Sequence, residues 1–186
     1  MKKCKVCSEP FDPIRPLQKV CSPACALTLA KQQAEKTKAK ALSQDRKATR
    51  EKLQAMQTRP QLLKKAQTAF NACIRARDVG KPCISCGTKL SDEPNTYDAG
   101  HYRSVGSAPH LRFIEHNVHG QCKHCNNYLA GNHVAYRMGL IERIGLTEVE
   151  KLEADSEPRK YTRDDLIELA KTYRDKARKL LKSSGS

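Results

Sequence analysis

The chain has 186 residues, of which 38% are hydrophobic, 5% are aromatic and none is tryptophan. This length predicts one domain or two small ones, and so few apolar side chains exclude one large hydrophobic core. Lys and Arg number 35 against 20 Asp and Glu, a net charge of +15, which indicates a polyanionic partner and first of all nucleic acid. No apolar run reaches the ~20 residues of a membrane span, and no apolar segment follows the basic N-terminus. We therefore expect a cytoplasmic protein with no membrane partner.

The first cysteine motif lies at the N-terminus, where Cys4-Lys5-Val6-Cys7 is followed by Cys21-Ser22-Pro23-Ala24-Cys25. Three prolines between these pairs disfavour a long helix and suit the loop of a zinc knuckle. In a reducing compartment, paired cysteines at this spacing indicate metal binding and not disulfides. The knuckle either contacts DNA or only anchors the helix that follows it. The predicted ligands of this first structural zinc ion are Cys4, Cys7, Cys21 and Cys25.

A second pair of Cys-x-x-Cys motifs occupies the middle of the chain. Its cysteines, Cys83, Cys86, Cys122 and Cys125, predict a second structural zinc ion. Four thiolate ligands leave no open coordination position, so this zinc ion is not expected to take part in chemistry. The ninth cysteine, Cys73, is predicted to be a buried small hydrophobic residue on a helix.

The segment from Leu27 to about Met56 contains neither proline nor glycine and is rich in Ala, Lys, Gln, Glu and Arg, a composition that favours a helix. It has few apolar side chains, so it is a solvated strut, a coiled-coil arm or a rod that binds phosphates. Its charge density favours DNA contact in addition to a strut role. The predicted DNA-binding residues are Lys38, Lys40, Arg46, Lys47 and Arg50.

Further helices are predicted on both sides of the central cysteines. One starts near Pro60, carries apolar residues at intervals of three and four, and ends before Gly80. Another runs from Asn132 to Ile144 and stops at Gly145.

Two helices are predicted after Gly145. Thr147 and Glu150 predict a capping box for a short helix, and Thr162 and Asp165 predict another for the last helix. We expect the apolar stripe of this last helix to serve in docking or dimerisation. A homodimer would suit paired incision across a four-way junction, which follows from the symmetry of that substrate and not from these residues.

Polar residues between the central cysteine pairs suggest a second kind of chemistry. Phosphodiester hydrolysis requires a base and a metal ion that stays open to substrate. His101 has the right side chain for the base, and the oxygens of Asp98 or Asn126 suit Mg²⁺ or Mn²⁺. Asn117 would orient His101 or hold its loop. Alternatively, His101 is a surface residue in a glycine-flanked turn.

This order of Cys-x-x-Cys, Gly-His, Asn and Cys-x-x-Cys-Asn resembles the HNH (His-Me) endonuclease fold, a ββα-metal unit on a zinc ribbon. The stretch Gly120-Gln121-Cys122-Lys123-His124-Cys125-Asn126, followed by Gly131, resembles the phage junction-resolving endonucleases of T4 type. Over nearly the whole chain, the knuckle, the basic helix, the stretch from Phe70 to Asp78 and Gly100-His101-Tyr102 resemble the lambdoid phage NinG (Rap) recombination proteins.

The resemblance implies an α+β, zinc-stapled and mostly helical chain that cleaves branched recombination intermediates such as Holliday junctions and D-loops in the cytoplasm of the host cell. It places His101 as general base, Asn117 as the central asparagine and Asn126 as a ligand of catalytic Mg²⁺ or Mn²⁺. The acid that usually precedes the base is Gly100 here. A β-bulge at Gly100 would bring Asp98 to the site; otherwise His133 or Asn132 completes the metal shell.

The predicted segments are a knuckle over 1–28, a basic helix or linker over 29–60, the HNH-like module over 61–145 and a helical segment over 146–186. Two other functions fit the same composition. One is a non-catalytic zinc-ribbon protein that binds branched or single-stranded DNA. The other is a zinc-stabilised adaptor that recruits other recombination proteins through the basic helix.

Overall fold

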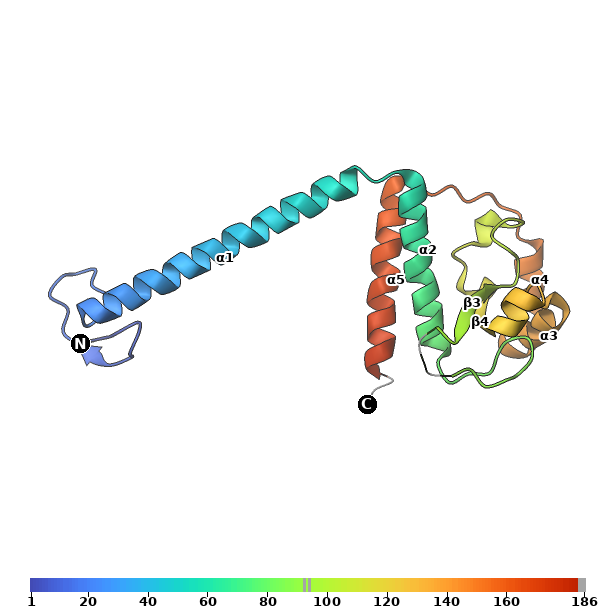
Figure 1. Ribbon diagram of the computed structural model, residues 1–186, viewed down its shortest axis with the longest axis horizontal. Coiled ribbons are helices and arrows are strands. Elements are labelled where there is room, and N and C mark those ends of the chain that lie inside the picture. The colour runs from blue at the N-terminus through green and yellow to red at the C-terminus, as the bar shows by residue number, and fades with distance from the viewer. Residues whose placement is uncertain (92, 94, 184–186) are drawn as a thin grey trace. The chain divides into compact units, whose positions relative to one another are not determined.

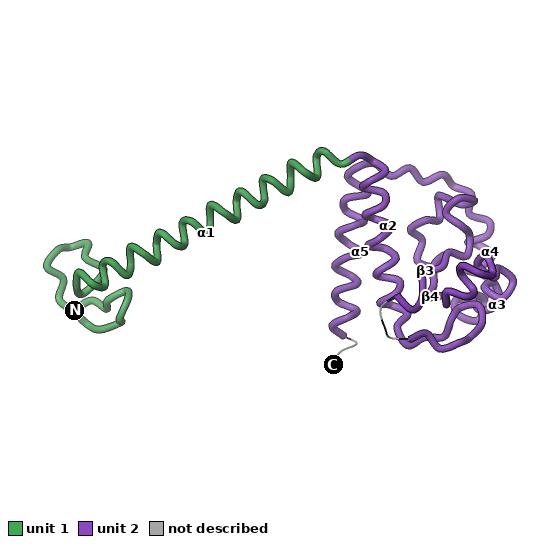
Figure 2. The backbone as a smooth tube through the Cα atoms, in the orientation of Figure 1, with its two compact units in different colours: residues 1–57 green, residues 58–186 purple. Residues whose placement is uncertain are grey.

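A computed structural model of the chain describes residues 1–91, 93 and 95–183. The backbone forms two compact units, Met1–Gln57 and Thr58–Ser186 (Figure 2). The boundary between them falls within the segment that the sequence predicts as basic helix or linker. The architecture is α+β and mostly helical, with two small antiparallel sheets.

The first unit consists of a small cysteine-rich loop and one long helix. Strand β1 (Lys2–Lys3) pairs with β2 (Pro10–Phe11), and helix α1 spans Pro23–Ala55 (Figure 1). The Ser22 side chain caps α1 by accepting a hydrogen bond from the Cys25 amide. None of the residues of α1 is buried, so the predicted basic helix is present and its surface is solvated within this unit.

The second unit is built on two long helices that pack side by side, α2 (Arg59–Asp78) and α5 (Arg163–Ser183) (Figure 1). The amide of Thr58 donates to Gln61 at the start of α2, and the predicted capping box of Thr162 and Asp165 opens α5. Their shared core contains Leu62, Ala66, Phe70, Ile74, Leu166 and Ala170.

The apolar stripe of α5 therefore packs against α2 within the chain. Of the two expected uses, the structure shows docking, within the chain itself, and Leu166, Ala170 and Ala177 are buried in that intramolecular core and not exposed for dimerisation. Burying such side chains against α2 stabilises the fold by removing apolar area from water.

A β-hairpin lies against α2 and carries the central site. Strand β3 (Tyr97–His101) pairs antiparallel with β4 (Val118–Cys122). The connection between them contains two 3₁₀ turns, η1 (Pro109–Leu111) and η2 (Glu115–Asn117). One turn of π-helix, η3 (His124–Tyr128), follows β4.

Two shorter helices complete the second unit, α3 (His133–Ile144) and α4 (Leu146–Ala154). A second core joins Tyr136 and Leu140 of α3 to Val149 and Leu152 of α4. The predicted capping box at Thr147 is wrong: α4 begins at Leu146, directly after Gly145, which has a φ of +85°. The glycine conformation makes the sharp turn between the helices and leaves no room for a separate cap.

Among the described residues, no helix is both long enough and apolar enough to cross a membrane.

Candidate functional site

The central cysteine cluster joins segments that lie far apart in the sequence. Cys83 and Cys86 belong to a turn after α2, Cys122 ends β4, and Cys125 lies in η3. Their four Sγ atoms lie within 4.8 Å of one another. The amides of Cys122 and Cys125 approach the sulfurs of Cys83 and Cys122 at 3.4 and 3.5 Å. Backbone amides aimed at sulfur stabilise the thiolate form that a metal ion requires.

The N-terminal cluster has the same construction on a smaller scaffold. Cys4 and Cys7 lie in the turn between β1 and β2, Cys21 precedes α1, and Cys25 lies in its first turn. Their Sγ atoms also lie within 4.8 Å of one another. Anchoring Cys25 in α1 ties the long helix to the cluster.

The sulfur geometry of both clusters fits zinc. Zn–S bonds of about 2.3 Å in a tetrahedron place the sulfur atoms about 3.8 Å apart. The Sγ separation is 3.5 Å for Cys7 and Cys21 and 3.7 Å for Cys86 and Cys122. Both predicted sets could therefore hold zinc, and four thiolates would make each site structural. Cys73 is buried on α2, outside both clusters, as the sequence predicts.

A small polar cluster lies next to the central cysteines. Asn126, which directly follows Cys125, donates from Nδ2 to Oδ2 of Asp98 at 3.0 Å. Asn127 donates to the same carboxylate oxygen at 3.3 Å. Asp98 is partly exposed on β3, so its carboxylate is within reach of solvent. The structure thus brings together two of the predicted metal ligands, Asp98 and Asn126, and adds Asn127.

His101 lies on the other face of β3. The alternative of a β-bulge at Gly100 is wrong: in β3 and β4, both fully described, Asp98 pairs with Gln121 and Gly100 with His119 in an unbroken register. Residues three apart in a regular strand point to opposite faces. Gly100 is needed for a different reason, since a Cβ there would lie 3.0 Å from the Cβ of Gln121.

The His101 ring is half-buried beside α2, with its centroid 6.5 Å from that of Phe70. Its Nε2 lies 3.2 Å from the carbonyl oxygen of Arg112. A carbonyl only accepts hydrogen bonds, so Nε2 carries the proton in this arrangement. Burial lowers the pKa of His101, and hydrogen bonding to the Arg112 and Ala99 carbonyls opposes this in part. None of the described contacts joins His101 to Asp98 or Asn126.

Asn117 is fully buried and holds the loop after β3. Its Oδ1 accepts from the Arg103 amide at 2.9 Å, and its Nδ2 donates to the carbonyls of Arg103 and Leu111 at 3.0 and 3.2 Å. The Tyr102 amide donates to the Asn117 carbonyl at 2.8 Å. Of its two predicted roles, these contacts match the holding of the loop that follows His101.

The remaining predicted site residues lie apart from this cluster. His133 is exposed in the first turn of α3, and none of the described contacts joins it to Asp98. Asn132 caps α3 with a φ of +44° and donates to the sulfur of Cys125 at 3.7 Å. The predicted DNA-binding residues of α1 all have exposed side chains: Lys38, Lys40, Arg46, Lys47 and Arg50.

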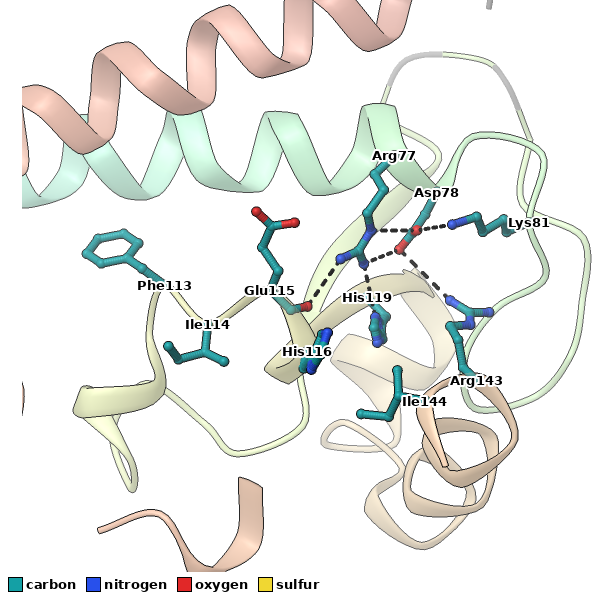
Figure 3. Close-up of a pocket in the computed structure, with 10 residues that line it drawn as sticks. All are labelled: Arg77, Asp78, Lys81, Phe113, Ile114, Glu115, His116, His119, Arg143 and Ile144. Carbon is teal, nitrogen blue, oxygen red and sulfur yellow. Dashed lines mark hydrogen bonds and ion pairs between the residues drawn. The ribbon is translucent and has the colours of Figure 1, made fainter. Parts of the chain in front are cut away.

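A charged pocket at the end of α2 is the feature that sequence reasoning missed. Asp78 is fully buried and accepts from Arg77 at 2.8 Å and from Lys81 at 3.0 Å (Figure 3). It also accepts from the Gly120 amide at 2.8 Å. Arg143 lies 3.9 Å from the same carboxylate. Burial alone would raise the pKa of Asp78, but the hydrogen bond and charge of Arg77 hold it well below its usual value.

His119 forms part of the same pocket. Its Nδ1 lies 3.0 Å from Nη2 of Arg77, and because a guanidinium only donates, Nδ1 must accept. His119 is therefore neutral, with its proton on Nε2. Burial, reinforced by the positive charge of Arg77, lowers the pKa of His119 to about 3. The only signal in the sequence is the charged group Arg77-Asp78 close to the first central cysteine.

The fold and the cysteine geometry define a small α+β protein with two cysteine clusters suited to zinc. A family model described as "Bacteriophage Lambda NinG protein" matches residues 1–183. The chain belongs to this NinG family.

Relatives from several phages support the assignment over nearly the full length. "Protein ninG" of Salmonella phage P22 is 38% identical over 192 residues, which cover 96% of this chain and 93% of the relative. "Protein ninG" of Escherichia phage lambda is 37% identical over 195 residues, which cover 98% and 94%. No solved structure matches the chain.

Proposed function

We propose that the chain is a metal-dependent, structure-specific DNA endonuclease that acts on branched recombination intermediates such as Holliday junctions and D-loops. The observation that carries the proposal is the contact between Asp98 and Asn126, 3.0 Å apart, directly beside the central cysteine cluster. A carboxylate and an amide oxygen are ligands that suit Mg²⁺ or Mn²⁺. The rigid cluster fixes Asn126 next to Cys125 and so positions one ligand against the other.

The oxygen atoms of these three side chains suit a hard cation, and they leave coordination positions of that cation free for substrate. Asp98 offers a carboxylate, and Asn126 and Asn127 offer amide oxygens once their side chains turn from their present hydrogen bonds. When bound, such an ion would neutralise charge on the scissile phosphate and on the leaving oxygen. This part of the proposal rests on Asp98 of β3 and on two asparagines of η3.

His101 is proposed as the general base, and burial, which lowers its pKa, favours the neutral ring that a base requires. A base must hold a free lone pair, and the proton on Nε2 leaves Nδ1 as the basic atom. Asn117 acts as a positioning residue, since its three side-chain hydrogen bonds hold the loop that follows His101.

DNA contact is assigned to the exposed basic residues of α1. A helix with none of its residues buried and with Lys and Arg along its length can neutralise several phosphates. We propose that the protein works in the host-cell cytoplasm, beside other recombination proteins. A homodimer would suit paired incision, because a four-way junction has two-fold symmetry.

A non-catalytic protein that binds branched DNA is the second candidate, and one observation favours it. His101 lies on the face of β3 opposite Asp98, and its Nε2 bonds to the Arg112 carbonyl as a structural histidine does. A binding protein needs the cysteine clusters and the basic helix but has no use for a base.

The test separates the two functions on the same DNA. Purified zinc-loaded protein is incubated with end-labelled four-way junction, D-loop and linear duplex, with Mg²⁺, Mn²⁺ or no added divalent ion. Omitting the ion is preferable to adding a chelator, because a chelator also competes for zinc. The endonuclease proposal expects incision of branched DNA only with the divalent ion, whereas binding without incision in every condition supports the second candidate.

A further inference from the structure

We infer that the charged pocket at the end of α2 is a binding site for a phosphate group of the DNA backbone. The pocket has a volume of about 560 Å³. It lies between α2, the loop that contains η2, β4 and the end of α3 (Figure 3). The inference rests on the proposed DNA substrate, but it does not depend on cleavage.

The first argument is the balance of charge. Arg77, Lys81 and Arg143 contribute three positive charges to the lining, and Asp78 and Glu115 contribute two negative ones. Glu115 is further neutralised by Lys176 of α5, whose Nζ lies 2.5 Å from its carboxylate. The pocket and its surroundings therefore keep an excess of positive charge that an anion would balance.

The second argument is that two donors in the lining make no hydrogen bond. Nη1 of Arg143 and Nε2 of His119 are both buried, and neither makes a hydrogen bond among the described residues, although Nη1 is ion-paired with Asp78 at 3.9 Å. Because Nδ1 of His119 accepts from Arg77, its Nε2 must carry a proton. Buried donors are nearly always paired in folded proteins, so two orphan donors in one pocket indicate a missing acceptor.

The third argument is access. The side chains of Lys81 and Arg143 are 46% and 21% exposed, while Asp78 behind them is fully buried. His116 lies exposed on the same lining and adds a further nitrogen. The buried carboxylate holds the cations in place; Arg143 also donates to the Pro82 carbonyl at 3.0 Å, and the exposed ends of Lys81 and His116 remain open to a ligand. Oxygens of a phosphate match this set of nitrogen donors.

The pocket is separate from the Asp98 cluster. Its charged residues come from α2, the segment after it, η2 and α3, and none of them is among the described partners of Asp98. It therefore binds DNA at a phosphate other than the one to be cut, which would fix the duplex relative to the hairpin.

The test begins with inorganic phosphate as probe, measured by calorimetry on the zinc-loaded full chain without added magnesium. Lys81→Gln combined with Arg143→Gln removes two donors but keeps Asp78 paired with Arg77. Lys151→Gln combined with Arg178→Gln removes the same charge at exposed positions outside the pocket. Circular dichroism and zinc content show that each variant is folded.

We expect phosphate to bind once per chain, the pocket variant to weaken it ~10-fold or more, and the control variant to bind like the wild type. A short duplex should displace the phosphate. Equal loss in both variants, or no phosphate binding at all, overturns the site. Phosphate that no DNA displaces overturns its assignment to the DNA backbone. Because cleavage is not measured, a failed nuclease proposal does not affect this outcome.

Discussion

Nδ2 of Asn126 lies 3.0 Å from Oδ2 of Asp98, although the two residues belong to different elements. Asp98 is on β3, and Asn126 is in η3, immediately after the last cysteine of the central cluster. The cluster thus fixes the distance between the two proposed metal ligands. This links the structural cysteines to the proposed chemistry.

Asn126→Ala is expected to loosen the divalent ion, because it removes one of its proposed ligands. Cleavage of a four-way junction should fall, and raising Mg²⁺ or replacing it with Mn²⁺ should restore part of the rate. Initial rates over a magnesium titration measure this. Asn71→Ala is the control, because Asn71 is a partly buried asparagine of α2 whose described side-chain partner is Gln67 and not Asp98. A rate loss that no metal concentration changes would remove Asn126 from the metal site.

Cys83→Ser is expected to lose one zinc ion and unfold the hairpin region, since it removes one of four ligands that hold the turn to β4. Cys73→Ser is the matched control, because Cys73 is equally buried but lies outside both clusters. Elemental analysis should find two zinc ions per chain in the wild type and in Cys73→Ser. Equal zinc loss in both variants would contradict the assignment of the ligands.

Replacing Lys38, Lys40, Arg46 and Lys47 with Gln is expected to weaken binding to every DNA form together. Each phosphate contact contributes about 0.9 to the slope of log affinity against log salt on duplex DNA. The slope should therefore become shallower in the variant. Fluorescence anisotropy at several salt concentrations measures it, and an unchanged slope would make α1 a strut without DNA contact.

Gly139→Ala is expected to destabilise the second unit. A Cβ at Gly139 would collide with the backbone carbonyl of Ile84, so α3 could not pack against the central cysteine turn. We expect a loss of about 1–3 kcal/mol in the free energy of unfolding. At an exposed helical position, by contrast, replacing glycine with alanine would raise the free energy of unfolding by up to about 1 kcal/mol. Gly106→Ala, where a Cβ meets only Ser104 Oγ at 3.9 Å, is the control, and denaturant unfolding reports both.

His119 makes stability depend on pH. Its pKa is lowered to about 3 in the folded chain, whereas an unperturbed histidine titrates near about 6.5. Below that value the unfolded chain binds more protons, so the free energy of unfolding should fall as pH decreases, by at most about 1.4 kcal/mol per pH unit from this residue.

His119→Asn keeps an acceptor for Arg77 but does not titrate, so its unfolding free energy should fall less steeply than that of the wild type. The comparison is made between about pH 5 and about pH 6.5, where the unfolded histidine takes up its proton. Parallel curves for the two proteins would show that His119 is not held neutral by its surroundings.

Local sequence patterns predicted the features whose geometry is local. The Cys-x-x-Cys spacings place two thiolates on one turn, so both clusters could be predicted. The capping box at Thr162 and Asp165 was also predicted, because its two hydrogen bonds join residues three apart. The same reasoning failed at Thr147, where the positive φ of Gly145 sets the helix start.

Features that depend on distant neighbours could not be predicted. Whether Asp98 and His101 share a face depends on whether β3 is regular at Gly100, and this is shown only by its pairing with β4. The charged pocket likewise joins Asp78 to Arg143 and His119 from separate elements. The spacing of these residues in the sequence does not indicate that they are in contact.

The most direct test of the proposed endonuclease compares His101→Ala with the wild type on a labelled four-way junction in Mg²⁺. The variant keeps both cysteine clusters and the basic helix, so junction affinity should stay close to that of the wild type while cleavage falls by ~10²-fold or more. Unlike Asn126→Ala, it should gain nothing from added metal. Cleavage by the variant at the wild-type rate, or a wild type that binds junctions and never cuts them in any divalent ion, would contradict the proposal.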